Sequence, residues 1–130
     1  MNKDDVIRYW VESAEHDYPV MESLFDAGHY AWALFIGHLV VEKLLKAHHV
    51  KHNPAPCPYT HNLLKLAEGA GLDLNEDARN FLIEMNAFNI NSRYPDLKHR
   101  FYKVATLDFT QDYIIKIREF RQWILQQNIN

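Results

Sequence analysis

The segment from Tyr30 to Lys51 constrains the fold of this chain more than any other. Its apolar residues fall on nearly every side of a helix, at Ala31, Trp32, Ala33, Leu34, Phe35, Ile36, Leu39, Val40, Val41, Leu44, Leu45 and Ala47. A helix that is apolar around most of its circumference is normally buried. We therefore expect a central helix surrounded by others, in a chain long enough to bury a core without disulfides or metals.

Three polar residues interrupt this apolar surface at every fourth position. They are His38, Glu42 and Lys46. Residues four apart lie on one face of a helix, so the three form a single polar stripe. The stripe is compatible with an internal line of salt bridges, with the lining of a cleft, or with a contact between subunits. The simplest alternative is a Glu-to-Lys pair on a helix surface, worth about 0.2–0.5 kcal/mol.

The chain before this segment also has helical periodicity. Apolar residues recur along one face from Val6 to Phe25. Pro19 lies inside that pattern and predicts a kink or a break, because it lacks an N–H group and restricts the preceding residue. Gly28 is suited to end the helix.

The second half of the chain is expected to be helical as well. Prolines at positions 54, 56 and 58 exclude helix and central strand from residues 52–59. Thr60 can cap a short helix from His61 to Gly69 or Gly71, and Asn75 can cap the next. A last helix should begin near Asp108. No segment alternates like a strand, so we expect a single domain over residues 1–130 with an all-α fold: an antiparallel, up-and-down bundle of four to five helices.

Composition limits the classes of function. The formal net charge of −3 and the pI near 6.2 argue against a general affinity for nucleic acid. Cys57 is the only cysteine, so no intrachain disulfide can form. The first residues show no apolar signal core, and the sequence has no apolar run of membrane-spanning length, so we expect a cytoplasmic protein without a membrane partner. The eight histidines show no familiar zinc spacing, so neither a metal nor a cofactor is expected.

Positive charge is concentrated between positions 93 and 103. This part of the chain holds Arg93, Lys98, His99, Arg100 and Lys103, opposed only by Asp96. A local positive patch on a mildly acidic protein suggests a phosphate-bearing partner that is met at one place. Alternatively, the segment is a plain connection in which Arg93 caps the helix that ends near Phe88 and pairs with Asp96.

Several of these residues together resemble the HEPN domain family. They are Tyr30, Ala31, Ala33, Leu34, Phe35, Glu42, Lys43, Leu45, Lys46 and Ala47, then His61, Asn62 and Leu63, and later Arg93, Tyr94, Pro95 and Asp96. The resemblance covers essentially the whole chain. It implies a small antiparallel helical bundle, usually dimeric, found in prokaryotes beside a minimal nucleotidyltransferase as a toxin–antitoxin pair.

Many members of that family are metal-independent ribonucleases with an Arg-x(4–6)-His motif. The motif falls here on Arg93 and His99. Phe101 stands two positions after the histidine, where the toxin branch has tyrosine, and Tyr94 follows the arginine, where nuclease members commonly have a polar residue. The resemblance therefore implies Arg93 and His99 as the catalytic pair.

The chemistry of these two side chains suits cleavage of RNA without a metal. An imidazole titrates near neutral pH and can take a proton from a 2′-hydroxyl, while a guanidinium binds two phosphate oxygens in a fork. The product would carry a 2′,3′-cyclic phosphate. Nucleotide or phosphate contacts are expected from Lys98, Arg100, Tyr102, Asp96, His38, Glu42, Lys46 and His61.

Other interpretations of the same residues stay open. His61 and Asn62 begin a helix whose free amides could hold an anion, or they only complete the cap. The protein is either the ribonuclease partner of a minimal nucleotidyltransferase, or a non-catalytic subunit that binds nucleotide or a partner protein, or a structural dimerisation module.

Overall fold

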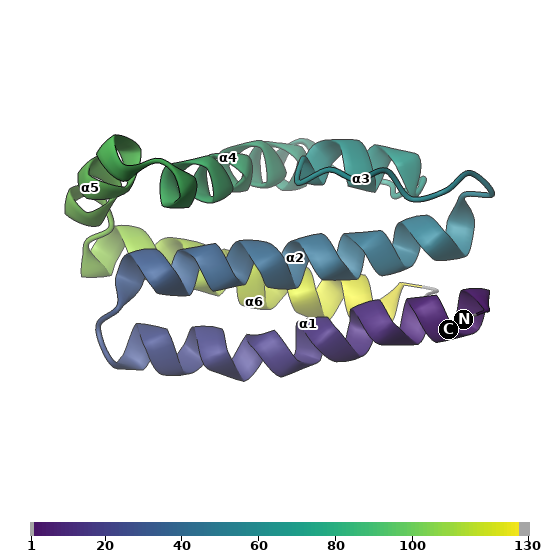
Figure 1. The fold of residues 1–130 in the computed structure, drawn as a ribbon, viewed down its shortest axis with the longest axis horizontal. Coiled ribbons are helices and arrows are strands. Elements are labelled where there is room, and N and C mark those ends of the chain that lie inside the picture. Colours follow the sequence, from purple (N-terminus) through teal and green to yellow (C-terminus); the bar gives the residue numbers. More distant parts are fainter. Residues whose placement is uncertain (1, 128–130) are drawn as a thin grey trace.

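The computed structural model describes residues 2–127, except for the side chains of Ser92 and Arg93. Over that range the chain forms six helices and no strand. They are α1 (Lys3–Asp26), α2 (Tyr30–His52), α3 (Leu63–Gly69), α4 (Glu76–Arg93), α5 (Pro95–Val104) and α6 (Leu107–Gln126). Each of the long helices α1, α2, α4 and α6 runs in the opposite direction to the long helix before it, and the short α3 and α5 lie toward opposite ends of the bundle (Figure 1). The expected all-α, up-and-down bundle is confirmed, with one short helix more than expected.

Helix α2 is the centre of the bundle, as its apolar sequence predicts. It packs against each of the other five helices. Its side chains at Leu34, Val40, Val41, Leu44 and Leu45 are fully buried. Burial of each such side chain contributes about 1.5–3 kcal/mol. Helix α2 therefore fixes the rotation of every helix around it, and with it the residues that face solvent.

Glycine allows the closest approach within this core. A Cβ atom at Gly37 of α2 would lie 2.5 Å from Ile117 Cδ1 of α6 and 3.0 Å from Met21 Sδ of α1. Both neighbouring side chains are fully buried. The missing side chain at Gly37 thus lets α1, α2 and α6 meet closely.

Of the kink or break predicted at Pro19, the break is wrong, because α1 continues through the proline. Ala14 and Met21, on either side of the proline, are both fully buried. Their packing holds both halves in register despite the missing N–H. The prediction for Gly28 is confirmed: its φ is +83°, its N–H donates to Phe25 O, and the next N–H donates to Leu24 O, which is the pattern of a glycine-terminated helix.

Two predicted helix starts have different outcomes. Asn75 caps α4 by accepting a hydrogen bond from Ala78 N, as expected. The cap of α3 is Asn62, whose side chain accepts from Lys65 N, so the prediction of Thr60 as the cap is wrong. The Thr60 hydroxyl instead accepts from the N–H of Asn62 and orders the approach to the helix.

The segment expected to connect two helices after Phe88 is itself largely helical. Helix α4 runs on to Arg93, and α5 begins at Pro95 after the single extended residue Tyr94. Proline is favoured in a first helical turn and restricts the residue before it to extended conformations. Pro95 therefore separates α4 from α5 without ending helical structure.

Polar contacts join α6 to α1 and to α2. Arg118 Nε of α6 donates to Glu22 Oε1 of α1 at 2.8 Å, and Arg121 of α6 pairs with Glu15 of α1. At the far end of α2, His48 Nε2 donates to Ile124 O of α6 at 3.1 Å. These contacts fix α6 along α1 and α2.

Two of the α2 histidines should make stability depend on pH. Burial lowers the pKa of His48, an effect partly opposed by its hydrogen bond to Ile124 O and assisted by the neighbouring His52, and burial also lowers the pKa of His49. In the unfolded chain both imidazoles titrate at the ordinary value of 6.5. Below that pH the unfolded state binds more protons than the folded state, so the stability present above pH 6.5 declines as the pH falls.

We therefore expect the free energy of unfolding to decrease between about pH 7 and pH 5, by at most about 1.4 kcal/mol per pH unit for each histidine. Urea unfolding across this range measures the slope. Replacing both histidines, His48→Gln and His49→Gln, should flatten it, whereas His16→Gln, at an exposed histidine of α1, should leave it unchanged. An equal slope in the double variant would contradict the assignment.

Candidate functional site

Helix α5 presents positive charge because one of its faces is held against the core. Phe101 is buried, and its ring packs 5.3 Å from that of Phe88 of α4. This contact fixes the rotation of the helix. His99, Arg100 and Lys103 then lie on the opposite side, all exposed.

The remaining lysine of α5 lies against aromatic rings. Lys98 Nζ is 4.5 Å from the ring centre of Trp32 in α2 and 5.9 Å from that of Tyr102 in α5. Both aromatic side chains are partly open to solvent, with exposed fractions of 41% and 46%. A cation over an aromatic face is stabilised by about 0.5–1 kcal/mol at such exposed sites. We call Lys98, His99, Arg100 and Lys103 the α5 basic surface.

A surface cavity of about 290 Å³ adjoins the α5 basic surface. It is lined by Gly28, His29, Tyr30, Ala31, Trp32, Tyr102 and Ala105. Trp32 and Tyr102 belong both to this cavity and to the contacts of Lys98. An open hollow with aromatic walls beside the Lys98 ammonium can take a flat ring and an attached phosphate.

Arg93 and Asp96 flank the α5 basic surface. Arg93 is the last residue of α4, and its side chain lies outside the described residues. The pairing of Arg93 with His99 therefore stays a prediction. Asp96 is exposed in the first turn of α5, where a carboxylate is stabilised by the helix dipole.

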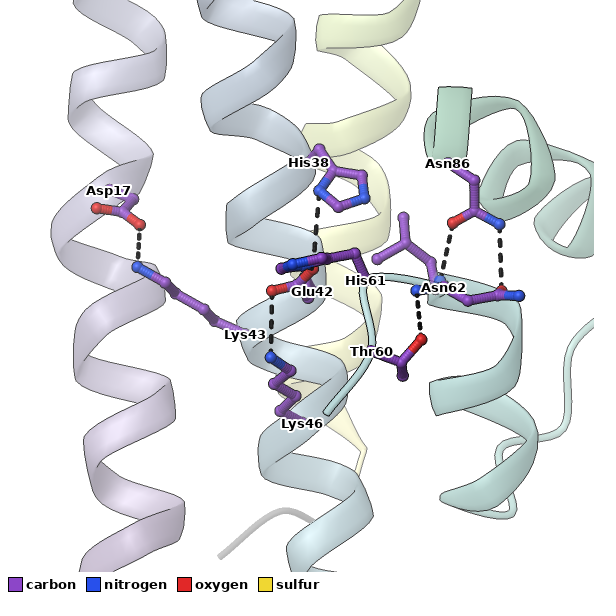
Figure 2. Close-up of polar contacts among 10 residues, drawn as sticks. Asp17, His38, Glu42, Lys43, Lys46, Thr60, His61, Asn62 and Asn86 are labelled. Carbon is purple, nitrogen blue, oxygen red and sulfur yellow. Dashed lines mark hydrogen bonds and ion pairs between the residues drawn. The ribbon is translucent and has the colours of Figure 1, made fainter. Parts of the chain in front are cut away.

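The polar stripe of α2 forms a buried cluster around Glu42, shown in Figure 2. Only 3% of Glu42 is exposed, and Lys46 Nζ lies 3.3 Å from its Oε2. His61 Nδ1 donates to Glu42 Oε1 at 2.7 Å, and His38 Nδ1 lies 4.0 Å from the same oxygen. Of the arrangements considered from the sequence, the internal line of salt bridges is the one seen. We call these four residues the Glu42 cluster.

His61 reaches this cluster from the segment before α3, which is itself tied to α4. Asn86 of α4 accepts from Leu63 N at 2.8 Å and donates to Asn62 Oδ1 at 3.2 Å. The amides of Asn62, Leu63 and Lys65 thus all donate to side chains. The alternative in which His61 and Asn62 complete the start of α3 accounts for these contacts.

The expected site residues therefore fall into two groups. Lys98, Arg100 and Tyr102 belong to the α5 end, whereas His38, Glu42, Lys46 and His61 form the Glu42 cluster. Trp32 and Glu42 are ten residues apart on α2, which corresponds to about 15 Å along the helix axis. Within the Glu42 cluster, His61 is the member most open to solvent, with 34% of its side chain exposed.

Sequence reasoning missed Trp32 and Asn86. Trp32 was counted only as an apolar residue of α2, and its partner Lys98 lies far along the chain. The helical spacing of Lys98 and Tyr102, four residues apart, is the one signal that pointed to a shared surface. Asn86 had no distinguishing neighbour in the sequence.

Some expectations concern what the chain lacks. Among the described residues, no three His, Cys, Asp or Glu side chains are grouped so that they could hold a metal ion. Nor does any helix in that part of the chain have the length and apolar character needed to cross a membrane.

Comparison with known proteins gives the following matches. A family model described as "HEPN domain" matches residues 7–128. The crystal structure of TT1696 from Thermus thermophilus has a TM-score of 0.75 to this chain at 23% sequence identity, covering 97% of this chain and 98% of that one. At this identity the likeness shows the fold alone. No curated protein sequence matches.

Proposed function

Because this chain belongs to the HEPN domain family, we propose that its α5 end binds the phosphate groups of RNA or of a nucleotide. The observation that carries the proposal is the α5 basic surface beside the cavity lined by Trp32 and Tyr102. Three exposed basic residues on one helical face can contact successive phosphates, while the aromatic rings can stack on a base. Because the whole chain carries a net charge of −3, this attraction depends on the local positive charge of α5 rather than on the charge of the protein as a whole.

The finer proposal is that the protein is a metal-independent ribonuclease. His99 would take the proton of a ribose 2′-hydroxyl, whose oxygen attacks the adjacent phosphorus while the bond to the 5′ oxygen breaks. The leaving oxygen takes a proton from solvent, and a 2′,3′-cyclic phosphate remains. Arg93 would bind the phosphate oxygens as negative charge grows on them. A homodimer in the cytoplasm, paired with a minimal nucleotidyltransferase as toxin and antitoxin, completes this proposal.

A second candidate is a non-catalytic subunit that binds nucleotide or a partner protein. Binding needs only the exposed cations and rings, and these are all present at the α5 end without a contribution from Arg93. In this case His99 contributes positive charge or a hydrogen bond but transfers no proton. In either proposal the Glu42 cluster also contributes to nucleotide binding. The contact would be made by His61, the most exposed member of the cluster.

We expect Arg100→Gln and Lys103→Gln together to weaken binding of a labelled single-stranded RNA. If each residue contacts one phosphate, the slope of log K against log salt should fall by about 0.7 for each replacement. Fluorescence anisotropy at several salt concentrations measures both effects. The matched control is Lys3→Gln with Lys65→Gln, which removes the same charge from exposed positions outside α5. Equal slopes in the two double variants would contradict a specific role for α5.

A further inference from the structure

A second hollow lies away from both groups of residues described above. It is a groove of about 820 Å³ formed by the start of α4 and the second half of α6. Its lining includes the apolar residues Leu74, Phe81, Phe120 and Trp123, surrounded by polar and charged residues. No residue of the α5 basic surface or of the Glu42 cluster belongs to this lining.

The floor of the groove is apolar and aromatic. The rings of Phe81 and Phe120 lie 5.6 Å apart, and Trp123 lies 5.6 Å from Phe120. Phe81 and Phe120 are almost fully buried, whereas Leu74 and Trp123 are half-buried and reach into the opening. Leu74 and Trp123 therefore offer a partner a small apolar surface, which lies among the polar residues of the lining.

The rim of the groove is strongly acidic. Asp73, Asp77, Glu84 and Glu119 are all exposed around it, against Lys116 as the one basic lining residue. Glu84 also accepts a hydrogen bond from Tyr113 Oη at 2.8 Å, and Lys116 lies 4.9 Å from the Tyr113 ring. These contacts draw Glu84 and Lys116 toward Tyr113. Phosphate groups would be repelled from such a rim, so RNA is not the partner that fits it.

From this combination we infer that the groove binds a basic amphipathic helix of a partner protein. Apolar residues on one side of that helix would pack on Trp123 and Leu74, and lysines or arginines beside them would meet the carboxylates. Residues 77–84 of α4 and 116–123 of α6 each span about 10 Å, which matches roughly two turns of helix. The inference is independent of the proposed function, because nucleotide binding uses the other surface.

The probe is a dansyl-labelled helical peptide with leucines along one face and lysines on the other. We expect it to bind the full chain in an anisotropy titration, more weakly as salt is raised. A peptide with the same leucines and glutamates in place of lysines should not bind. Asp73→Lys with Glu119→Lys should weaken binding at least about 10-fold, since like charges then face each other. Glu12→Lys with Asp26→Lys on α1 changes net charge equally at exposed positions and should alter binding less than about 2-fold.

Three results would overturn the inference. The first is a failure of the lysine peptide to bind, and the second is an equal loss of affinity in the two charge-reversal pairs. The third is self-association of the full chain that disappears on Asp73→Lys with Glu119→Lys, since a second copy would then occupy the groove. Circular dichroism of each variant separates these results from unfolding.

Discussion

The variant His99→Ala is expected to cleave single-stranded RNA about 10²–10⁴-fold more slowly in the absence of metal, which is the usual cost of removing a general base. His99 is exposed on α5, so its removal leaves no cavity in the core. The reaction should be followed in the presence of a chelator, with a labelled RNA whose 2′,3′-cyclic phosphate end is identified directly. Binding of the same RNA should change far less than the rate, because Lys98, Arg100 and Lys103 remain.

The matched control is His16→Ala, which removes another exposed histidine, from α1, and should cleave at the parental rate. Arg93→Ala should also reduce the rate, through loss of its contact with the phosphate oxygens. Cleavage that survives both His99→Ala and Arg93→Ala would exclude this assignment. RNA binding without any cleavage by the unaltered chain would leave the non-catalytic subunit.

The sequence was sufficient to predict the elements whose cause is local. Helix α2 has no polar face except one stripe, so it could only be the centre of a bundle. Gly28 and Asn75 were predicted as helix ends because a left-handed residue and a capping amide act within a few residues of the end.

Elements whose cause is distant in the sequence were not predicted. The segment that forms α5 was interpreted as a polar connection because it holds many charged residues. Its apolar helical face, formed by Leu97 and Phe101, was therefore overlooked. Only the aromatic contact of Phe101 with Phe88 shows why that face folds inward. In the same way, a kink or a break was predicted at Pro19. The break does not occur because Ala14 and Met21 pack in one core, which the sequence does not reveal.

The sequence was sufficient to name residues of the candidate site, but it did not show how those residues are grouped in space. The stripe of α2 was found from its spacing, but nothing in the sequence showed that His61 completes it from a loop. The proline-rich connection separates the two, and its path is set by contacts of Asn62 with Asn86 on α4. Lys98 and Tyr102 were expected as phosphate contacts, but their shared contact and the addition of Trp32 through the packing of α5 on α2 were not predicted.

Replacing Glu42 with alanine is expected to destabilise the fold by about 3–5 kcal/mol, the usual cost of breaking a buried ion pair from one side. The carboxylate bonds His61 with one oxygen and pairs with Lys46 through the other. Its loss leaves the Lys46 ammonium, whose side chain is 9% exposed, without its opposite charge. Urea unfolding measures the difference. That cost is a large fraction of the free energy of unfolding of a typical domain, roughly 5–15 kcal/mol, so the alanine variant could unfold. Thermal melting of the milder variant Glu42→Gln gives a second measurement.

The matched control is Glu15→Ala, which removes the partner of Arg121 from a pair whose carboxylate is 32% exposed. Such pairs contribute about 0–1 kcal/mol, so this loss should be much smaller. A double variant, Glu42→Met with Lys46→Met, should recover much of the stability, because replacing both charges of a buried pair with apolar groups removes the isolated ammonium. Equal losses for Glu42→Ala and Glu15→Ala, or no recovery in the double variant, would mean that the Glu42 cluster is held by packing rather than by its charges.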